Sequence, residues 1–240
     1  ESEFGVPKGS FLLLMAFVVA FGFVKGTLNF VAGRLSERLG RKTVLLLGWA
    51  SAIPIPFMIL YAPSWSWIVA ATVLLGMNQG FTWSMTQTAK LDITRADQRG
   101  LTMGLNEFSG YVGVAVAGII TGYLATALGP RMGLFVFGAT VIVTALVLTA
   151  LWVKETLAWA HAEGARHAAG KNTGPAPRFP QNISGQPTTW EVFTLMSWRD
   201  KRMAALSQAG LVEKFVDALI WVVYPVYLYE RGLSLAHIGW

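Results

Sequence analysis

Gly33-Arg34-Leu35-Ser36-Glu37-Arg38-Leu39-Gly40-Arg41-Lys42 is a basic segment that lies between two long apolar runs. The runs cover about residues 10–33 and 44–61, and Lys25 is the one charged side chain in them. A helix needs about 20 predominantly apolar residues to cross a hydrocarbon core of about 30 Å. The pattern therefore predicts two membrane helices joined by a short charged loop.

Four more apolar stretches follow, at about residues 67–88, 101–128, 132–153 and 203–229. Hydrophobic residues make up 54% of the chain and charged residues 13%, against about 25% charged in soluble domains. Lipid offers the backbone no hydrogen-bond partner, so spanning segments are helices or strands of a closed barrel, and the short alternating segments of a barrel are absent from the sequence. We predict an all-α polytopic membrane protein with six transmembrane helices.

Basic residues gather in alternate loops. Most Lys and Arg side chains lie after the first and third apolar stretches and between the fifth and the sixth. The positive-inside rule predicts that these loops are cytoplasmic, in a multi-pass protein of the cell's inner (plasma) membrane. The net charge of +6 then reflects topology, and we expect no nucleic-acid partner, because binding one would need the basic residues on one soluble face.

Small residues recur in the fourth stretch, where Gly100-x-x-x-Gly104 and Gly118-x-x-x-Gly122 have the spacing of closely packed membrane helices. We predict that this helix packs centrally in the bundle. The alternative is that these are ordinary small residues of a membrane helix, in which glycine is common.

The segment 154–202 is charged, weakly patterned and rich in Pro and Gly around 171–177. We predict a cytoplasmic linker with a flexible centre. Around 189–198 the sequence indicates an amphipathic segment on the inner membrane surface. Its apolar side is formed by Trp190, Val192, Phe193, Leu195, Met196 and Trp198.

The segment 33–42 resembles the signature of the loop between helices 2 and 3 in the major facilitator superfamily. That signature is Gly, any residue, Leu, any residue, an acid, a base, any residue, Gly and two bases. The resemblance implies a gating role for this motif, in a charge network that holds one end of the transporter closed. The matching positions are Gly33, Leu35, Glu37, Arg38, Gly40, Arg41 and Lys42.

The resemblance also implies the arrangement of the chain. Residues 1–153 are expected to be helices 2–6 of the N-terminal half, 154–202 the loop between the halves, and 203–240 helix 7 with the start of the C-terminal half. We therefore expect a fragment of a helical bundle, without the N-terminal helix and most of the C-terminal half, that is monomeric when complete.

Two positions depart from the pattern of proton-driven drug exporters in this family. Gly76 stands where many proton-coupled members have Arg in helix 4, and Gly110 is followed by Tyr111 where many drug/proton antiporters have Pro. Both departures weaken a proton-driven multidrug interpretation.

Polar side chains, several of them charged, lie within the apolar stretches, where a charged group costs about 2.5–3.5 kcal/mol on insertion scales. Such groups line a bundle interior or a water-filled path, so they are our candidate substrate and ion pathway. The alternative is that Lys25 extends to the interface and that the other groups hold helices together. The candidates are Lys25, Asn29, Asn78, Gln79, Glu107, Glu213 and Asp217.

The predicted function is secondary active transport of a small solute by alternating access, with an ion as coupling partner and export favoured over import. A membrane sensor or receptor and a channel-like protein are the alternatives. We do not expect an enzyme, a cofactor or a metal site, because His161, His167 and His237 form no catalytic or ligand constellation and no nucleotide-binding loop is present. The expected partners are the lipid bilayer, the solute and the coupling ion.

Overall fold

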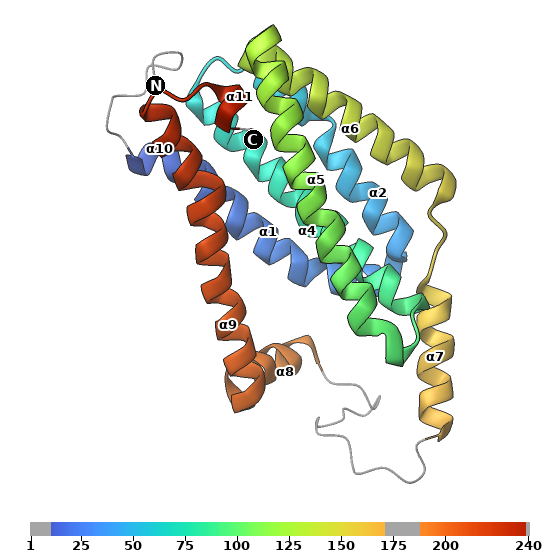
Figure 1. Ribbon diagram of the computed structural model, residues 1–240. Helices are drawn as coiled ribbons and strands as arrows, with labels where there is room; N and C mark the ends of the chain where they lie inside the picture. Colours follow the sequence, from blue (N-terminus) through green and yellow to red (C-terminus); the bar gives the residue numbers. More distant parts are fainter. Residues whose placement is uncertain (1–10, 171–187, 239–240) are drawn as a thin grey trace. The chain divides into compact units, whose positions relative to one another are not determined.

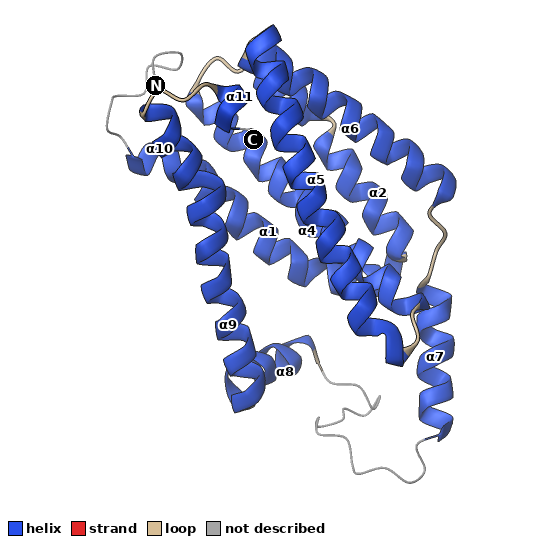
Figure 2. Cartoon of the chain, in the orientation of Figure 1, coloured by secondary structure: helices blue, strands red, loops and turns tan. Residues whose placement is uncertain are grey.

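The computed structural model describes residues 11–170 and 188–238, which form helices joined by short loops with no strand among them (Figure 2). The prediction of an all-α fold is confirmed. Contacts divide the chain into two units, Glu1–Arg166 with Ser234–Trp240, and His167–Leu233. The predicted flexible centre of the linker, 171–177, lies outside the described residues.

The described residues of the first unit form seven main helices, the last of which continues past Arg166, with a 3-10 turn at Ala96–Gln98 and the short helix α11, Leu235–Ile238 (Figure 1). Five of the six predicted apolar stretches correspond to helices here. The main helices are α1 (Phe11–Leu39), α2 (Arg41–Ala52), α3 (Pro54–Leu60), α4 (Trp65–Ile93), α5 (Arg99–Leu128), α6 (Pro130–Trp152) and α7 (Leu157–Gly170).

The loop predicted after residue 33 is helical as far as Leu39, and α2 begins at Arg41. Gly40, with φ 88°, is the one residue between them. An L side chain rarely adopts this left-handed backbone, so the second glycine of the motif sets the turn. The second stretch is divided at Ile53, because Pro54 supplies no N–H to continue α2 and starts α3 instead.

Helix α4 packs against α1, α2, α3 and α5, while α6 packs on α2, α3 and α5. Two glycines bring α4 close to α1: a Cβ added at Gly76 would lie 2.9 Å from the Phe21 carbonyl oxygen, and one at Gly80 would lie 2.8 Å from Leu28 Cβ. The central place predicted for the stretch 101–128 is therefore taken by α4. At Gly100 and Gly104 an added Cβ would meet no described atom within 4 Å.

Two buried clusters form the core of this unit. One joins Ala32, Val44, Leu45 and Met85, and the other joins Ala52, Ile55, Ala71 and Ile142. Many large apolar side chains remain outside them: Phe23 is 76% exposed and Leu101 78% exposed. In water such exposure opposes folding, whereas in a bilayer lipid chains cover these side chains.

Four helical stretches within the described residues are long and apolar enough to cross a membrane: Met15–Leu39, Arg41–Leu60, Ala96–Leu128 and Pro130–Trp152. The predicted count of six also included α4 and the helix expected at 203–229, and neither reaches this apolarity. Both are nevertheless helical over the predicted residues.

The second unit begins with the end of α7, from His167, and its described part continues with α8 (Thr189–Thr194), a π-helical turn (Leu195–Arg199) and α9 (Lys201–Ala218). A second π-helical turn (Leu219–Val223) and α10 (Tyr224–Glu230) continue α9, so the stretch predicted at 203–229 is one helical run. Pro225 lies in the first turn of α10. The wider turn before it accommodates a proline that cannot donate a backbone hydrogen bond.

Candidate functional site

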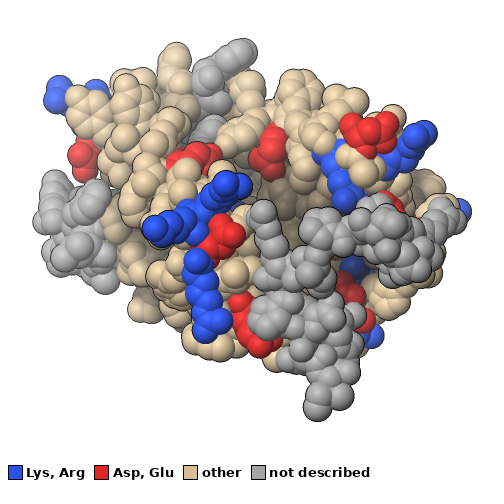
Figure 3. All heavy atoms as spheres, turned by 90° about the horizontal axis from the view of Figure 1, so that it is seen from below, with Lys and Arg blue, Asp and Glu red and all other residues tan. Residues whose placement is uncertain are grey.

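The motif of residues 33–42 folds into a charged cluster where α1 ends, α2 begins and α4 ends. We call Glu37, Arg41, Asp92, Glu155 and Thr156 the basic-end cluster. Seen from below the view of Figure 1, this end of the molecule shows Lys and Arg side chains beside Asp and Glu (Figure 3). Two ion pairs of Arg41 in α2, with Glu37 of α1 and with Asp92 of α4, join the ends of these helices.

Arg41 is the centre of the basic-end cluster, and its side chain is 5% exposed. Its Nη2 lies 2.8 Å from Glu37 Oε1, and its Nε donates to Asp92 Oδ2 at 3.0 Å. Thr156 Oγ1 donates to the same Asp92 oxygen at 2.8 Å. A buried guanidinium with two carboxylate partners thus ties α1, α2, α4 and the segment after α6.

Glu155 closes the start of α2. Its carboxylate accepts hydrogen bonds from the backbone N–H groups of Arg41 at 2.8 Å and Lys42 at 3.1 Å. These N–H groups have no partner inside the helix, and the N-terminal dipole favours a negative charge there. Partial burial acts to raise the pKa of the Glu155 carboxyl, but the backbone hydrogen bonds, from Leu157, Arg41, Lys42 and Thr156, outweigh it and lower that pKa below 4.5.

We expect the stabilising contribution of Glu155 to be complete above pH 4.5 and to disappear as the pH falls through its lowered pKa in the folded chain. Stability falls with falling pH because, between the lowered pKa of Glu155 in the folded chain and its ordinary pKa in the unfolded chain, the unfolded chain binds more protons. Thermal unfolding in detergent, followed by tryptophan fluorescence, measures this at pH 7 and in steps below pH 4.5.

Glu155→Gln is the matched control for this pH prediction, because its amide does not titrate. The difference in thermal midpoint between the parent and the variant is expected to shrink as the pH falls. A difference that stays constant over this range would mean that the charge of Glu155 does not stabilise the fold.

The other motif residues have simpler surroundings. Leu35 packs on the buried cluster around Ala32, and Lys42 Nζ donates to the Ala150 carbonyl oxygen at 2.8 Å. A Cβ added at Gly33 would meet no described atom within 4 Å. Arg38 is exposed at the end of α1.

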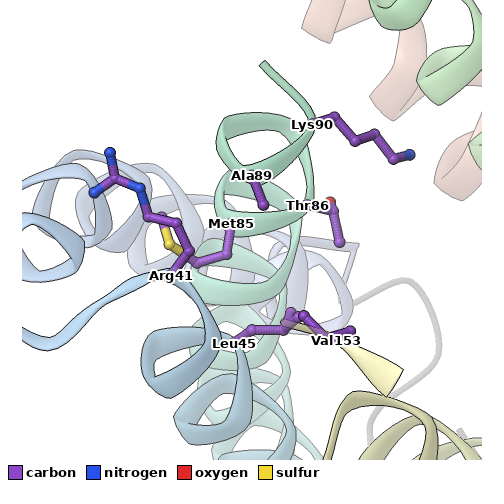
Figure 4. A pocket seen from close by; sticks show the side chains of 7 residues that line it. All are labelled: Arg41, Leu45, Met85, Thr86, Ala89, Lys90 and Val153. Carbon is purple, nitrogen blue, oxygen red and sulfur yellow. The ribbon is translucent and has the colours of Figure 1, made fainter. Parts of the chain in front are cut away.

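A hollow of about 170 Å³ lies beside the basic-end cluster (Figure 4). Arg41 and Leu45 line it from α2, Met85, Thr86, Ala89 and Lys90 from α4, and Val153 from the segment after α6. The charged ends of Arg41 and Lys90 point in opposite directions, and each is bonded to another side chain. Since its walls are mainly aliphatic, the hollow offers little to orient a polar solute.

Helices α1 and α4 share a polar seam, which we define as Lys25, Asn29, Gln79 and Ser84. Lys25 Nζ donates to Gln79 Oε1 at 3.0 Å, and Ser84 Oγ donates to Asn29 Oδ1 at 2.8 Å. Residue numbers in the two contacts rise in the same direction along α1 and along α4, so the two helices run parallel. Lys25 is 14 residues before the end of α1 at Leu39, or about 21 Å along the helix at about 1.5 Å per residue.

The structure places the predicted residue Asn78 on another face of α4. Its side-chain amide is buried and donates to the Gly48 carbonyl oxygen of α2 at 2.9 Å. Consecutive residues on a helix are about 100° apart, so Asn78 faces α2 while Gln79 faces α1. Of these two predicted pathway residues, only Gln79 therefore joins the polar seam.

Glu107 lies on α5, facing α4, where its Oε1 accepts from Gln87 Nε2 at 3.2 Å. Beside it, Asn106 is 2% exposed and accepts from Lys90 Nζ at 2.7 Å. The Asn106 Nδ2 has no hydrogen-bond partner among the described residues. These contacts connect α4 to α5, at a level of α4 that is closer to the basic-end cluster than the polar seam is.

The two acidic candidates of the second unit share one cation. Lys214 Nζ lies 2.9 Å from Glu213 Oε2 and 2.6 Å from Asp217 Oδ2, all within α9. Both carboxylates thus have a cationic partner inside one helix, and the three side chains together carry one net negative charge.

Asp92, Thr156 and Ser84 were not among the predicted site residues, and Glu155 was not given a role. Their partners are far away in the sequence, with 114 positions separating Glu155 from Arg41. One signal was available for Asp92, which is an acid at the end of an apolar stretch that leads into a basic loop.

The sequence profile of the Major Facilitator Superfamily matches residues 1–240. The chain is 35% identical over 91 residues to the proton-coupled antiporter flippase LtaA of Staphylococcus saprophyticus, which covers 38% of this chain and 22% of that protein. It is 32% identical over 124 residues to the class B tetracycline resistance protein of Escherichia coli, which covers 52% of this chain and 30% of that protein. The matches thus span less than a third of either relative.

Proposed function

Because this chain belongs to the major facilitator superfamily and is a multi-pass membrane protein, we propose that it is part of a secondary active transporter that moves a small solute by alternating access. Export is the favoured direction, since the two relatives are named as an antiporter flippase and a resistance protein. We propose an ion as the coupling partner and place the basic loops in the cytoplasm. A sensor or a channel is less favoured, because both relatives carry names of transport proteins or resistance factors.

The observation that supports this proposal best is the polar seam between α1 and α4. A lysine held by an amide at 3.0 Å, far from the helix end, is costly in lipid unless it faces a polar path. The Phe21 ring, 5.5 Å from Lys25 Nζ, stabilises the cation from another side. In the proposal, the positive charge of Lys25 attracts a passing solute or ion.

The basic-end cluster has a different role in the proposal. It joins the ends of α1, α2 and α4 to the segment after α6 through Arg41 and Glu155. We propose that these helices move as one body when the transporter changes between its two open states, with solute binding near the membrane midplane between the two halves. Residues 1–153 would belong to one half, 154–202 to the connecting loop, and 203–240 to the other half.

Lys25→Met is the test of this function in the full-length transporter. The change removes the charge and keeps most of the volume, so the protein is expected to insert normally while the transport rate falls tenfold or more. A tenfold loss corresponds to about 1.4 kcal/mol in the rate-limiting barrier. The measurement is uptake into inverted vesicles, with tetracycline and a fluorescent lipid analogue as the first probes.

Lys154→Met is the matched control, because Lys154 follows α6, is exposed and lies outside the membrane helices. It is expected to transport at the parental rate. If Lys25→Met also transports at that rate with normal insertion, Lys25 only holds α1 against α4 and the pathway assignment is wrong. Absence of saturable transport by the parent for any solute would favour a sensor.

A further inference from the structure

Three aromatic rings lie together in the segment 188–202. The Trp190 and Phe193 rings stack with centroids 5.4 Å apart and an interplanar angle of 26°. Phe193 and Trp198 meet edge to face at 5.4 Å and 75°. Trp190 is 69% exposed and Trp198 66% exposed, so the cluster presents a broad aromatic surface outward. We propose that this segment is an anchor that binds the surface of an anionic lipid bilayer.

The anchor is an ordered element. At its start, Thr188 and Glu191 form a capping box in which the Thr188 side chain accepts from the Glu191 N–H and the Glu191 side chain accepts from the Thr188 N–H. At its end, the Asp200 side chain accepts from Arg202 N and Met203 N and so caps α9. Ser207 Oγ also donates to the Met196 carbonyl oxygen at 3.3 Å, which fixes the π-helical turn against α9.

The charges of the anchor match an anionic surface. Arg199, Lys201 and Arg202 follow the aromatic cluster and are all exposed. The two acids of the segment, Glu191 and Asp200, are bonded to backbone N–H groups at the starts of their helices. Basic side chains adjoining tryptophan and phenylalanine are typical of segments that lie in the interface of anionic membranes.

Tryptophan suits this place for a further reason. Its ring is largely apolar, but its indole N–H needs a hydrogen-bond partner, so the side chain concentrates at the level of lipid headgroups. Two exposed tryptophans within one segment therefore favour a lipid surface over open water. Helix α9 starts only three residues after Trp198, so a membrane-inserted α9 would hold the anchor at the surface.

The test uses the absence of cysteine from the chain. A single cysteine at Ser197→Cys, in the π-helical turn beside the three rings, carries an environment-sensitive fluorophore and leaves the aromatic cluster intact. The protein is reconstituted into vesicles of phosphatidylcholine with phosphatidylglycerol and headgroup-level nitroxide lipid. We expect quenching about twofold or more above that of the same label at Gly164→Cys, a position on α7 with open space around it. Circular dichroism verifies that both variants keep the parental helix content.

Two further measurements separate the aromatic from the electrostatic part. Phe193→Ser is expected to reduce the quenching at position 197 towards the Gly164 level. The combined change Arg199→Gln, Lys201→Gln and Arg202→Gln is expected to remove the difference between vesicles with and without phosphatidylglycerol. Quenching at 197 no greater than at 164 would overturn the anchor. Equal quenching in both lipid mixtures, without the three Gln changes, would overturn its preference for anionic lipid.

Discussion

Asp92→Asn is expected to lower the free energy of unfolding by about 3 kcal/mol, the lower end of the 3–5 kcal/mol range for breaking a buried ion pair. Arg41 and Asp92 side chains are 5% and 9% exposed, and Arg41 Nε donates to Asp92 Oδ2 at 3.0 Å. The change leaves a buried guanidinium with Glu37 as its remaining carboxylate partner. It also weakens the bond that Asp92 accepts from Thr156. Thermal or denaturant unfolding in detergent, followed by tryptophan fluorescence, measures the loss.

Asp97→Asn is the matched control for this effect. Asp97 also pairs with an arginine, Arg95, but at 3.5 Å, and their side chains are 67% and 80% exposed. An exposed pair of this kind contributes about 0–1 kcal/mol, so we expect a change close to zero. Equal losses for the two variants would show that burial of the Arg41 pair has no special importance.

Gly40→Ala is the second variant with a large expected effect. The φ of 88° at Gly40 disfavours any residue with a Cβ, at a cost of about 1–3 kcal/mol. An added Cβ would also collide with the Glu155 carboxylate. We therefore expect the variant to unfold at lower temperature and to lose much of the stabilisation that Glu155 gives to the start of α2. Comparing the parent, Gly40→Ala, Glu155→Gln and the double variant Gly40→Ala/Glu155→Gln measures that coupling.

Gly33→Ala is the natural control, since Gly33 belongs to the same motif. It lies within α1, and an added Cβ would meet no described atom within 4 Å. Alanine favours a helix over glycine by about 0.8–1 kcal/mol, so the expected result is unchanged or slightly higher stability. A loss at Gly33 as large as at Gly40 would mean that the backbone turn is not the reason for the second glycine.

The sequence predicted the helices best where apolar runs define them. The stretch expected at 132–153 is α6, Pro130–Trp152, and the stretch at 101–128 is α5, Arg99–Leu128. The end of α1 was placed too early, because polarity begins at Arg34 whereas the helix continues to Leu39. Polarity reports where lipid ends, while the backbone conformation of Gly40 determines where the helix ends.

Within the candidate site, only contacts between near neighbours in the sequence could be derived from spacing. Glu37 and Arg41 are four positions apart and form an ion pair, although Gly40 separates the end of α1 from the start of α2. The partner of Arg41 across helices, Asp92, is 51 positions away, and only the packing of α4 against α2 brings it near. Asn78 and Gln79 are both amides at adjacent positions, so their residue types did not predict that Asn78 faces α2 and Gln79 faces α1.

Helix α4 has a consequence for how the protein is made. It is the centre of the first unit, yet it is not among the stretches apolar enough to cross a membrane by composition. Several of its polar side chains bond to earlier helices: Thr72 and Gln79 to α1, and Asn78 to α2. Since α1 and α2 precede α4 in the chain, the ribosome releases the partners of these groups before the groups themselves. The order of synthesis thus lets α4 enter the membrane beside the helices that satisfy its polar side chains.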